Sequence, residues 1–116
     1  KIIEVEKLNI DDADVVVISY GISSRVAHRA MDLAREEGIK VGMLRLINVW
    51  PFPDYMIREL SERVKAFVTV ELNMGQIALE VERCAAGKCG CYMVPHAGGE
   101  VHRPEVIAEA IKEAAK

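Results

Sequence analysis

Short apolar runs of strand length are the feature of this sequence that most constrains its fold. Residues 15–19 (VVVIS) are β-branched and show no apolar–polar alternation, and residues 41–47 and 66–70 form two further, mostly apolar runs. A strand without alternation is covered on both faces, as in a parallel sheet. Pro51 and Pro53 follow the second run, so the chain is expected to leave the sheet there in an extended crossover.

Segments with helical periodicity separate these runs. A first helix is predicted after Gly21, with Ser23 or Ser24 as its N-cap and Gly38 as its end. Its apolar stripe is Val26, Ala27, Ala30, Met31 and Ala34, and its opposite face is Arg29, Asp32, Arg35 and Glu36. Further elements are expected as helices at about 53–64, 77–85 and 104–116, a fourth strand at 91–94, and a lead-in segment or edge strand at 1–13.

The alternation of strands and helices with short connections defines an α/β fold with a mostly parallel sheet between helices. The 116 residues are expected to form one domain, 1–116. A formal net charge of −3 without a basic stripe argues against nucleic acid as a partner. No apolar run approaches the roughly 18 residues that span a bilayer, so no membrane partner is expected.

Three cysteines, Cys84, Cys89 and Cys91, are an odd number in a chain without a signal peptide. This favours reduced thiols and a cytoplasmic location. Together with His96 and His102 they invite a zinc interpretation, but the spacing contains neither a C-x₂-C pair nor a ferredoxin-type cluster motif. We therefore expect no metal ligands in this chain, and likewise no catalytic and no cofactor-binding residues.

The loop after the first strand is one of two places where polar residues indicate binding, because α/β sheets meet ligands at the carboxyl ends of their strands. There, Ser23, Ser24 and Arg25 form a candidate anion site at a helix N-terminus. Turn and capping roles are the commoner use of such residues. After the third strand, Glu71, Asn73 and Gln76 either specify a partner by hydrogen bonds or satisfy the exposed backbone.

The loop after the second strand is aromatic rather than polar. Trp50, Pro51, Phe52 and Pro53, with Tyr55 nearby, hold half of the chain's aromatic residues. Aromatic residues are enriched at interfaces, although covering the end of the sheet is an equally good use for them. Together with Glu71, Asn73 and Gln76, the four residues from Trp50 to Pro53 form the candidate interface.

Four sequence segments together resemble a known family. They are ADVVVISYGISS, REEGIKVGMLRLINVWPFP, VTVELNMGQIALEV and GGEVHRPEVI, and they cover nearly the whole chain from Ala13 onward. The succession is similar to the C-terminal part of the α subunit of 2-oxoacid:ferredoxin oxidoreductases, most of all the 2-oxoglutarate type. The W-P-F-P and E-x-N-x-G-Q segments carry the resemblance, whereas the residues from Cys84 to Cys91 match no pattern of the family.

The resemblance implies a three-layer α/β/α sandwich like the transketolase C-terminal domain, with one antiparallel edge strand. It also implies an enzyme that decarboxylates a 2-oxoacid oxidatively, forms an acyl-CoA and reduces ferredoxin. Such an enzyme uses thiamine diphosphate, magnesium, iron–sulfur clusters and coenzyme A. The chain lacks a G-D-G…N motif and a set of cluster ligands.

We therefore expect a non-catalytic structural or assembly domain that is inactive alone. Its partners would be the missing N-terminal domain of the same subunit, the β subunit of an oligomeric enzyme and, indirectly, ferredoxin. Because the sequence begins at Lys1 without an initiator Met, a C-terminal fragment of a longer subunit is expected. The alternative is a free-standing α/β anion-binding or ligand-binding module that uses the turn at Ser23, Ser24 and Arg25.

Overall fold

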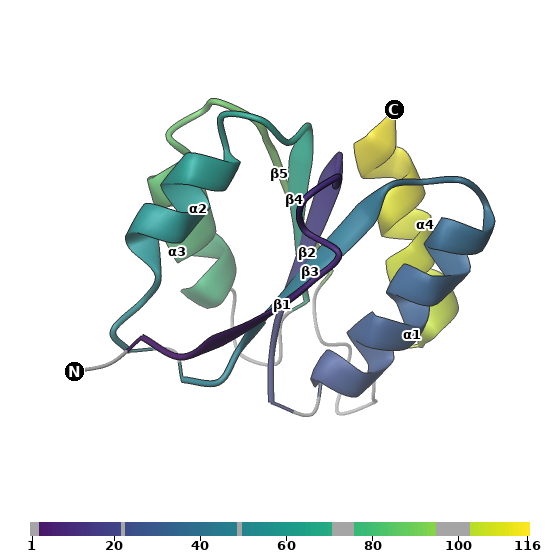
Figure 1. Cartoon of the computed structure of the whole chain (residues 1–116), viewed down its shortest axis with the longest axis horizontal. Helices are drawn as coiled ribbons and strands as arrows, with labels where there is room; N and C mark the ends of the chain where they lie inside the picture. Colours follow the sequence, from purple (N-terminus) through teal and green to yellow (C-terminus); the bar gives the residue numbers. More distant parts are fainter. Residues whose placement is uncertain (1–2, 22, 49, 71–75, 95–102) are drawn as a thin grey trace.

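Five strands form one sheet in the order β1-β3-β2-β4-β5 in the computed structural model, which describes residues 3–21, 23–48, 50–70, 76–94 and 103–116 (Figure 1). The strands are β1 (Val5–Leu8), β2 (Val15–Tyr20), β3 (Val41–Leu46), β4 (Ala66–Val70) and β5 (Gly90–Val94). Only β1 is antiparallel to its neighbour, and β3, β2, β4 and β5 all run parallel. The predicted mostly parallel sheet with one antiparallel edge strand is confirmed, and the lead-in segment supplies that edge.

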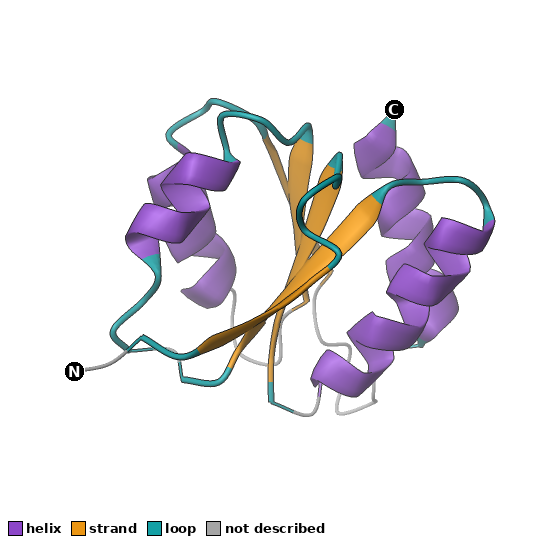
Figure 2. Cartoon of the chain, viewed as in Figure 1, coloured by secondary structure: helices purple, strands orange, loops and turns teal. Residues whose placement is uncertain are grey.

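Four helices cover the two faces of the sheet (Figure 2). One layer holds α1 (Ser23–Glu36) and α4 (Pro104–Ala115), and the other holds α2 (Asp54–Leu60) and α3 (Gln76–Ala85). Each central strand feeds both layers, because successive side chains of a strand point to opposite faces. In β2, Val15 and Val17 pack toward α1 and α4, whereas Val16 and Ile18 pack toward α2 and α3. The predicted three-layer α/β/α sandwich is therefore confirmed.

The second helix is shorter than the sequence predicts. It ends at Leu60 rather than near residue 64, and the Ser61 hydroxyl donates a hydrogen bond of 2.6 Å to the Arg58 carbonyl oxygen. Val64 is nevertheless buried, in the core beneath α2 and α3. The apolar spacing that extended the predicted helix reflects packing of the turn at residues 61–63, in which the Val64 N–H still donates a hydrogen bond of 3.0 Å to the Leu60 carbonyl oxygen.

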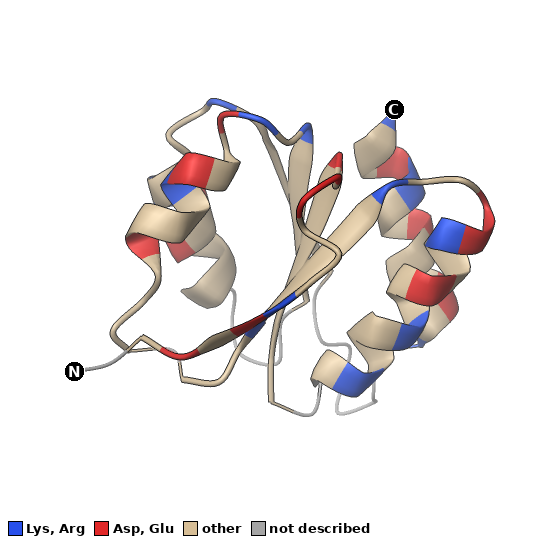
Figure 3. Cartoon of the chain, viewed as in Figure 1, with Lys and Arg blue, Asp and Glu red and all other residues tan. Residues whose placement is uncertain are grey.

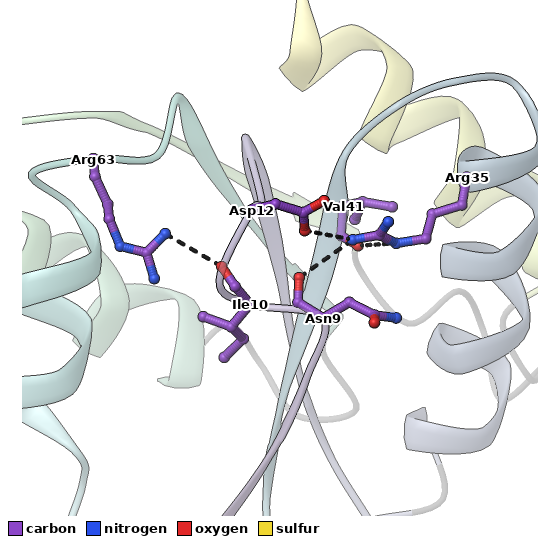
Figure 4. Close-up of polar contacts among 6 residues, drawn as sticks. All are labelled: Asn9, Ile10, Asp12, Arg35, Val41 and Arg63. Atoms are coloured by element: carbon purple, nitrogen blue, oxygen red, sulfur yellow. Dashed lines mark hydrogen bonds and ion pairs between the residues drawn. The ribbon is translucent and has the colours of Figure 1, made fainter.

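Two arginines hold the loop between β1 and β2 from opposite layers (Figure 4). Arg35 of α1 donates hydrogen bonds to the Val41 carbonyl oxygen (2.8 Å) and the Asn9 carbonyl oxygen (3.3 Å), and it lies 3.0 Å from the Asp12 carboxylate. Arg63, after α2, donates a hydrogen bond of 3.2 Å to the Ile10 carbonyl oxygen. Arg35 is thus half-buried rather than on a solvent-facing surface, because its long side chain reaches over the sheet to backbone carbonyl oxygens.

The same loop crosses β3 at close range. A Cβ atom at Gly42 would lie 2.6 Å from the Asn9 carbonyl oxygen, so only glycine fits at this position of the strand. The Arg35 guanidinium also lowers the pKa of the Asp12 carboxyl, first by its hydrogen bond and then by its charge. At the amino ends of the parallel strands, the loop between β1 and β2 is therefore held in place by hydrogen bonds from both helix layers and by close packing against β3, which indicates a structural role for this end of the sheet.

Candidate functional site

The carboxyl ends of β2, β3, β4 and β5 lie at the end of the sheet opposite the loop between β1 and β2 (Figure 1). The predicted binding residues that the structure describes are near this end, because the helices that follow the strands begin there. Glu71 and Asn73 lie outside the described residues, and Gln76 is the exposed first residue of α3. The proposed role of these three residues stays a prediction.

The predicted anion-binding residues in and after the turn that follows β2 differ in how far they are buried. Gly21 has a φ of +67°, a conformation that glycine adopts without strain, and its carbonyl oxygen accepts a hydrogen bond of 3.1 Å from the Ser24 N–H. The Ser24 side chain is buried, and its hydroxyl oxygen accepts a hydrogen bond of 3.0 Å from the buried Ser19 hydroxyl. Arg25, in contrast, is exposed, and the side chain of Ser23 is not described. Ser24 therefore faces the interior, and Arg25 is the described member of the predicted site that an external anion can reach.

A groove lies beside this turn, between α1 and the strands β1 and β3. It has a volume of about 880 Å³ and is open to solvent along one side. Its lining from α1 includes Arg25, His28, Arg29 and Asp32, and its lining from the sheet includes Glu6, Met43 and Arg45. The sequence analysis missed this groove, because it depends on how the edge strand and the helix are placed relative to each other. The one available signal was the run of basic residues at Arg25, His28 and Arg29.

The two aromatic rings in the segment after β3 differ in exposure: Trp50 is exposed and Phe52 is buried. Trp50 is 64% exposed, whereas Phe52 is only 6% exposed and packs in the core beneath α2 and α3. Their ring centroids lie 6.2 Å apart, with the planes tilted by 50°. Pro53 is buried, Pro51 is half-buried, and the Trp50–Pro51 peptide bond is cis. Trp50 is therefore the member of this segment that presents a large apolar surface outward, from a base fixed in the core.

The three cysteines are free thiols, as predicted. Cys84 is buried, and Cys89 and Cys91 are half-buried against the core beneath α2 and α3. Burial raises the pKa of the Cys84 and Cys89 thiols, and burial together with the neighbouring Cys89 raises the pKa of Cys91 to about 11. No three His, Cys, Asp or Glu side chains of the described segments are grouped as metal ligands would be, and His96 and His102 lie outside those segments.

We expect Cys91 to resist alkylation near neutral pH. At pH 8 a thiol with a pKa of about 11 holds roughly one hundredth of the thiolate of an unperturbed cysteine, and the thiolate is the reactive form. Iodoacetamide labelling followed by peptide mass spectrometry should show a rate about 100-fold below that of a model peptide, rising tenfold per pH unit up to about pH 11. A rate at pH 8 equal to that of the model peptide would show that the site is not shielded.

The pyruvate:ferredoxin oxidoreductase core domain II family matches residues 13–107 of this chain. Among curated relatives, the 2-oxoglutarate synthase subunit KorA of Methanothermobacter marburgensis is 43% identical over 96% of this chain and 30% of its own length. The ketoisovalerate oxidoreductase subunit VorB of Methanothermobacter thermautotrophicus is 42% identical over 95% of this chain and 31% of its own length. The chain therefore spans about 30% of the length of the curated relatives it matches.

Solved structures with a similar fold include a 2-oxoglutarate:ferredoxin oxidoreductase from Magnetococcus marinus, with 2-oxoglutarate, coenzyme A and succinyl-CoA bound. It matches with a TM-score of 0.82 and 25% identity, over 97% of this chain and 20% of that one. A split-gene transketolase, in an inactive β4 tetramer, matches with a TM-score of 0.77 and 19% identity, over 88% of this chain and 38% of that one. The transketolase-like fold that the sequence predicts is confirmed.

None of the described helices is long and apolar enough to cross a membrane.

Proposed function

Because this chain belongs to the pyruvate:ferredoxin oxidoreductase core domain II family, we propose that it is a non-catalytic assembly domain of a 2-oxoacid:ferredoxin oxidoreductase. The resemblance predicted from the sequence is confirmed by the family match and by the 2-oxoglutarate synthase relatives. The observation that carries the proposal is that about 95% of this chain matches only about 30% of the length of each relative, as one domain of a longer subunit would. The alternative of a free-standing ligand-binding module is not favoured, since the relatives contain this domain as one part of a longer subunit.

Among the described residues, we find no set of ligands that would hold magnesium with a diphosphate or an iron–sulfur cluster. The sequence has no G-D-G…N motif for magnesium and a diphosphate, and the described thiols and carboxylates form no ligand group. We therefore place thiamine diphosphate, magnesium, the iron–sulfur clusters and coenzyme A elsewhere in the enzyme, and we assign no reaction step to residues 1–116.

Under this proposal, the reaction is the oxidative decarboxylation of a 2-oxoacid to an acyl-CoA, with electrons passed to ferredoxin in the cytoplasm. The names of the relatives favour 2-oxoglutarate, although the nearly equal identity to the VorB subunit means that this domain does not distinguish between 2-oxoacids. Residues 1–116 would act as one domain of the α subunit. That domain would contact the N-terminal domain of the same subunit and the β subunit of the oligomer.

Trp50 is the residue that we assign to docking. Its exposed ring stands on a base formed by buried Phe52 and Pro53, so little side-chain or backbone freedom is lost when a partner covers it. A rigid, amphipathic Trp is typical of the few residues that dominate interface energies. Gln76 is available at the same edge of the sheet to add a hydrogen bond.

The proposal is tested in the complete α and β subunits, with a thiamine-dependent dye-reduction assay and analytical ultracentrifugation. Trp50→Ala should weaken subunit assembly by about tenfold to 100-fold, the range for a truncated hot-spot aromatic. Val106→Ala, on α4 in the opposite layer, should leave assembly unchanged although Val106 is also exposed. Residues 1–116 alone should neither bind thiamine diphosphate in calorimetry nor reduce the dye. Activity of that fragment would refute the non-catalytic role, and unchanged assembly of Trp50→Ala would refute the docking role.

A further inference from the structure

The groove between α1 and the strands β1 and β3 is positively charged in a chain whose net charge is negative. Arg25, Arg29 and Arg45 line it, against the carboxylates of Glu6 and Asp32. Figure 3 shows basic residues in the N-terminal half of α1. The sign of the local charge therefore differs from that of the whole chain.

Both carboxylates of the groove already have partners. Glu6 lies 3.4 Å from Arg45 across the β1–β3 pair, and Asp32 lies 3.5 Å from His28 one turn earlier on α1. Arg25 and Arg29, in contrast, have neither an ion pair nor a side-chain hydrogen bond with any described residue. Two guanidinium groups are thus left to bind a carboxylate from outside, and the positive end of the α1 dipole favours negative charge at the same place.

The spacing of the two free arginines fits an extended chain. Residues four apart on a helix have Cβ atoms about 6 Å apart, and alternate side chains of an extended segment lie about 7 Å apart on one face. Carboxylates at alternate positions of a strand-like segment can therefore reach Arg25 and Arg29 together. The groove is open to solvent, and Arg25 and Arg29 are exposed rather than enclosed. An open site suits a polypeptide segment better than a small molecule that must be surrounded.

We propose that this groove is a docking site for an acidic, extended segment of another protein, with carboxylates at alternate positions bound by Arg25 and Arg29. Arg45 adds positive charge from the floor while it keeps its pair with Glu6. The site is distinct from Trp50 and does not depend on the docking role of that residue. Because both free arginines are exposed and have neither an ion pair nor a side-chain hydrogen bond with a described residue, we expect their replacement to leave the fold intact.

The test uses the 116-residue chain and a synthetic peptide of alternating Glu and Thr, with a Gln and Thr peptide as the uncharged control. Binding is followed by NMR, on backbone amide and Arg side-chain signals, at low salt and at about 0.5 M NaCl. We expect shifts confined to α1, β1 and β3, no shifts with the Gln peptide, and affinity that falls by about tenfold or more at high salt, where charges are screened within about 4 Å.

Matched variants separate this groove from general positive charge. The double variant Arg25→Gln, Arg29→Gln should lose at least tenfold in affinity. Arg58→Gln, which removes an exposed arginine from α2, should lose less than twofold. Equal losses in both variants would overturn the proposal. So would tighter binding of inorganic tripolyphosphate than of the Glu peptide at the same signals, which would assign the groove to small polyanions. Self-association that the double variant abolishes would assign it to a second copy of this chain.

Discussion

Phe67→Ala lowers the free energy of unfolding by about 4 kcal/mol, the range measured when a buried aromatic ring is removed from a core. Phe67 is the second residue of β4, is fully buried, and belongs to the core cluster beneath α2 and α3 that includes Ile57 and Val81. It has no room to relax, because β4 is held on both sides by parallel neighbours. Urea denaturation followed by circular dichroism measures the change.

Tyr55→Ala is the matched control for this substitution, since it removes a similar ring from a side chain that is 80% exposed. The expected change is within about 0.5 kcal/mol, as for most surface positions. A loss below 1 kcal/mol for Phe67→Ala, with an unchanged denaturant slope, would mean that the core beneath α2 and α3 is not packed as the structure describes.

Gly42→Ala is expected to cost about 3 kcal/mol, because the new methyl group would lie 2.6 Å from the Asn9 carbonyl oxygen and 2.9 Å from the Asn9 carbonyl carbon. Backbone atoms cannot rotate away as a side chain can. The loop would have to lift from β3, and with it the hydrogen bonds from Arg35 to Asn9 and from Arg63 to Ile10. Thermal unfolding and amide hydrogen exchange of β1 would both report the change.

Gly90→Ala provides the comparison, since its Cβ atom would meet the ring of Tyr92 at 3.0 Å. That ring is half-exposed and can move aside, so we expect a loss of about 1 kcal/mol or less. Equal losses at Gly42 and Gly90 would show that the close crossing of Asn9 over β3 does not determine the cost.

The strands and helices could be predicted from the sequence because strands that are buried on both faces appear as continuous apolar runs, and the helices between them show apolar residues at helical spacing. Strand β4 covers residues 66–70, as predicted from its apolar run. Helix α4 begins at Pro104, where a proline fits the first turn of a helix. The end of α2 could not be predicted, because the apolar spacing continues to Val64 through a turn. The half-buried position of Arg35 could not be predicted either, since its partners are Val41 at the start of β3 and the β1–β2 loop residues Asn9 and Asp12, which only the fold brings together.

The candidate site was less accessible to sequence reasoning than the fold. Composition identified the aromatic exit from β3, but it could not tell that Phe52 is anchored while Trp50 is displayed, since both rings are equally apolar in the sequence. The same holds for Ser24, whose hydroxyl faces Ser19 in the interior. The groove beside α1 combines residues from three elements, and its floor depends on β1 lying against β3, a pairing that only the three-dimensional arrangement specifies.

The antiparallel edge strand also has a consequence for the cost of assembling the sheet. Its partner β3 follows β2 and α1 in the sequence, so pairing β1 with β3 closes a long loop around that unit, at an entropic cost. A short strand paired on one side is also the first to open. Because Glu6 of this strand forms part of the groove floor, a segment that binds there would hold β1 closed. Binding and the local opening of the sheet would then be thermodynamically linked, and each would limit the other.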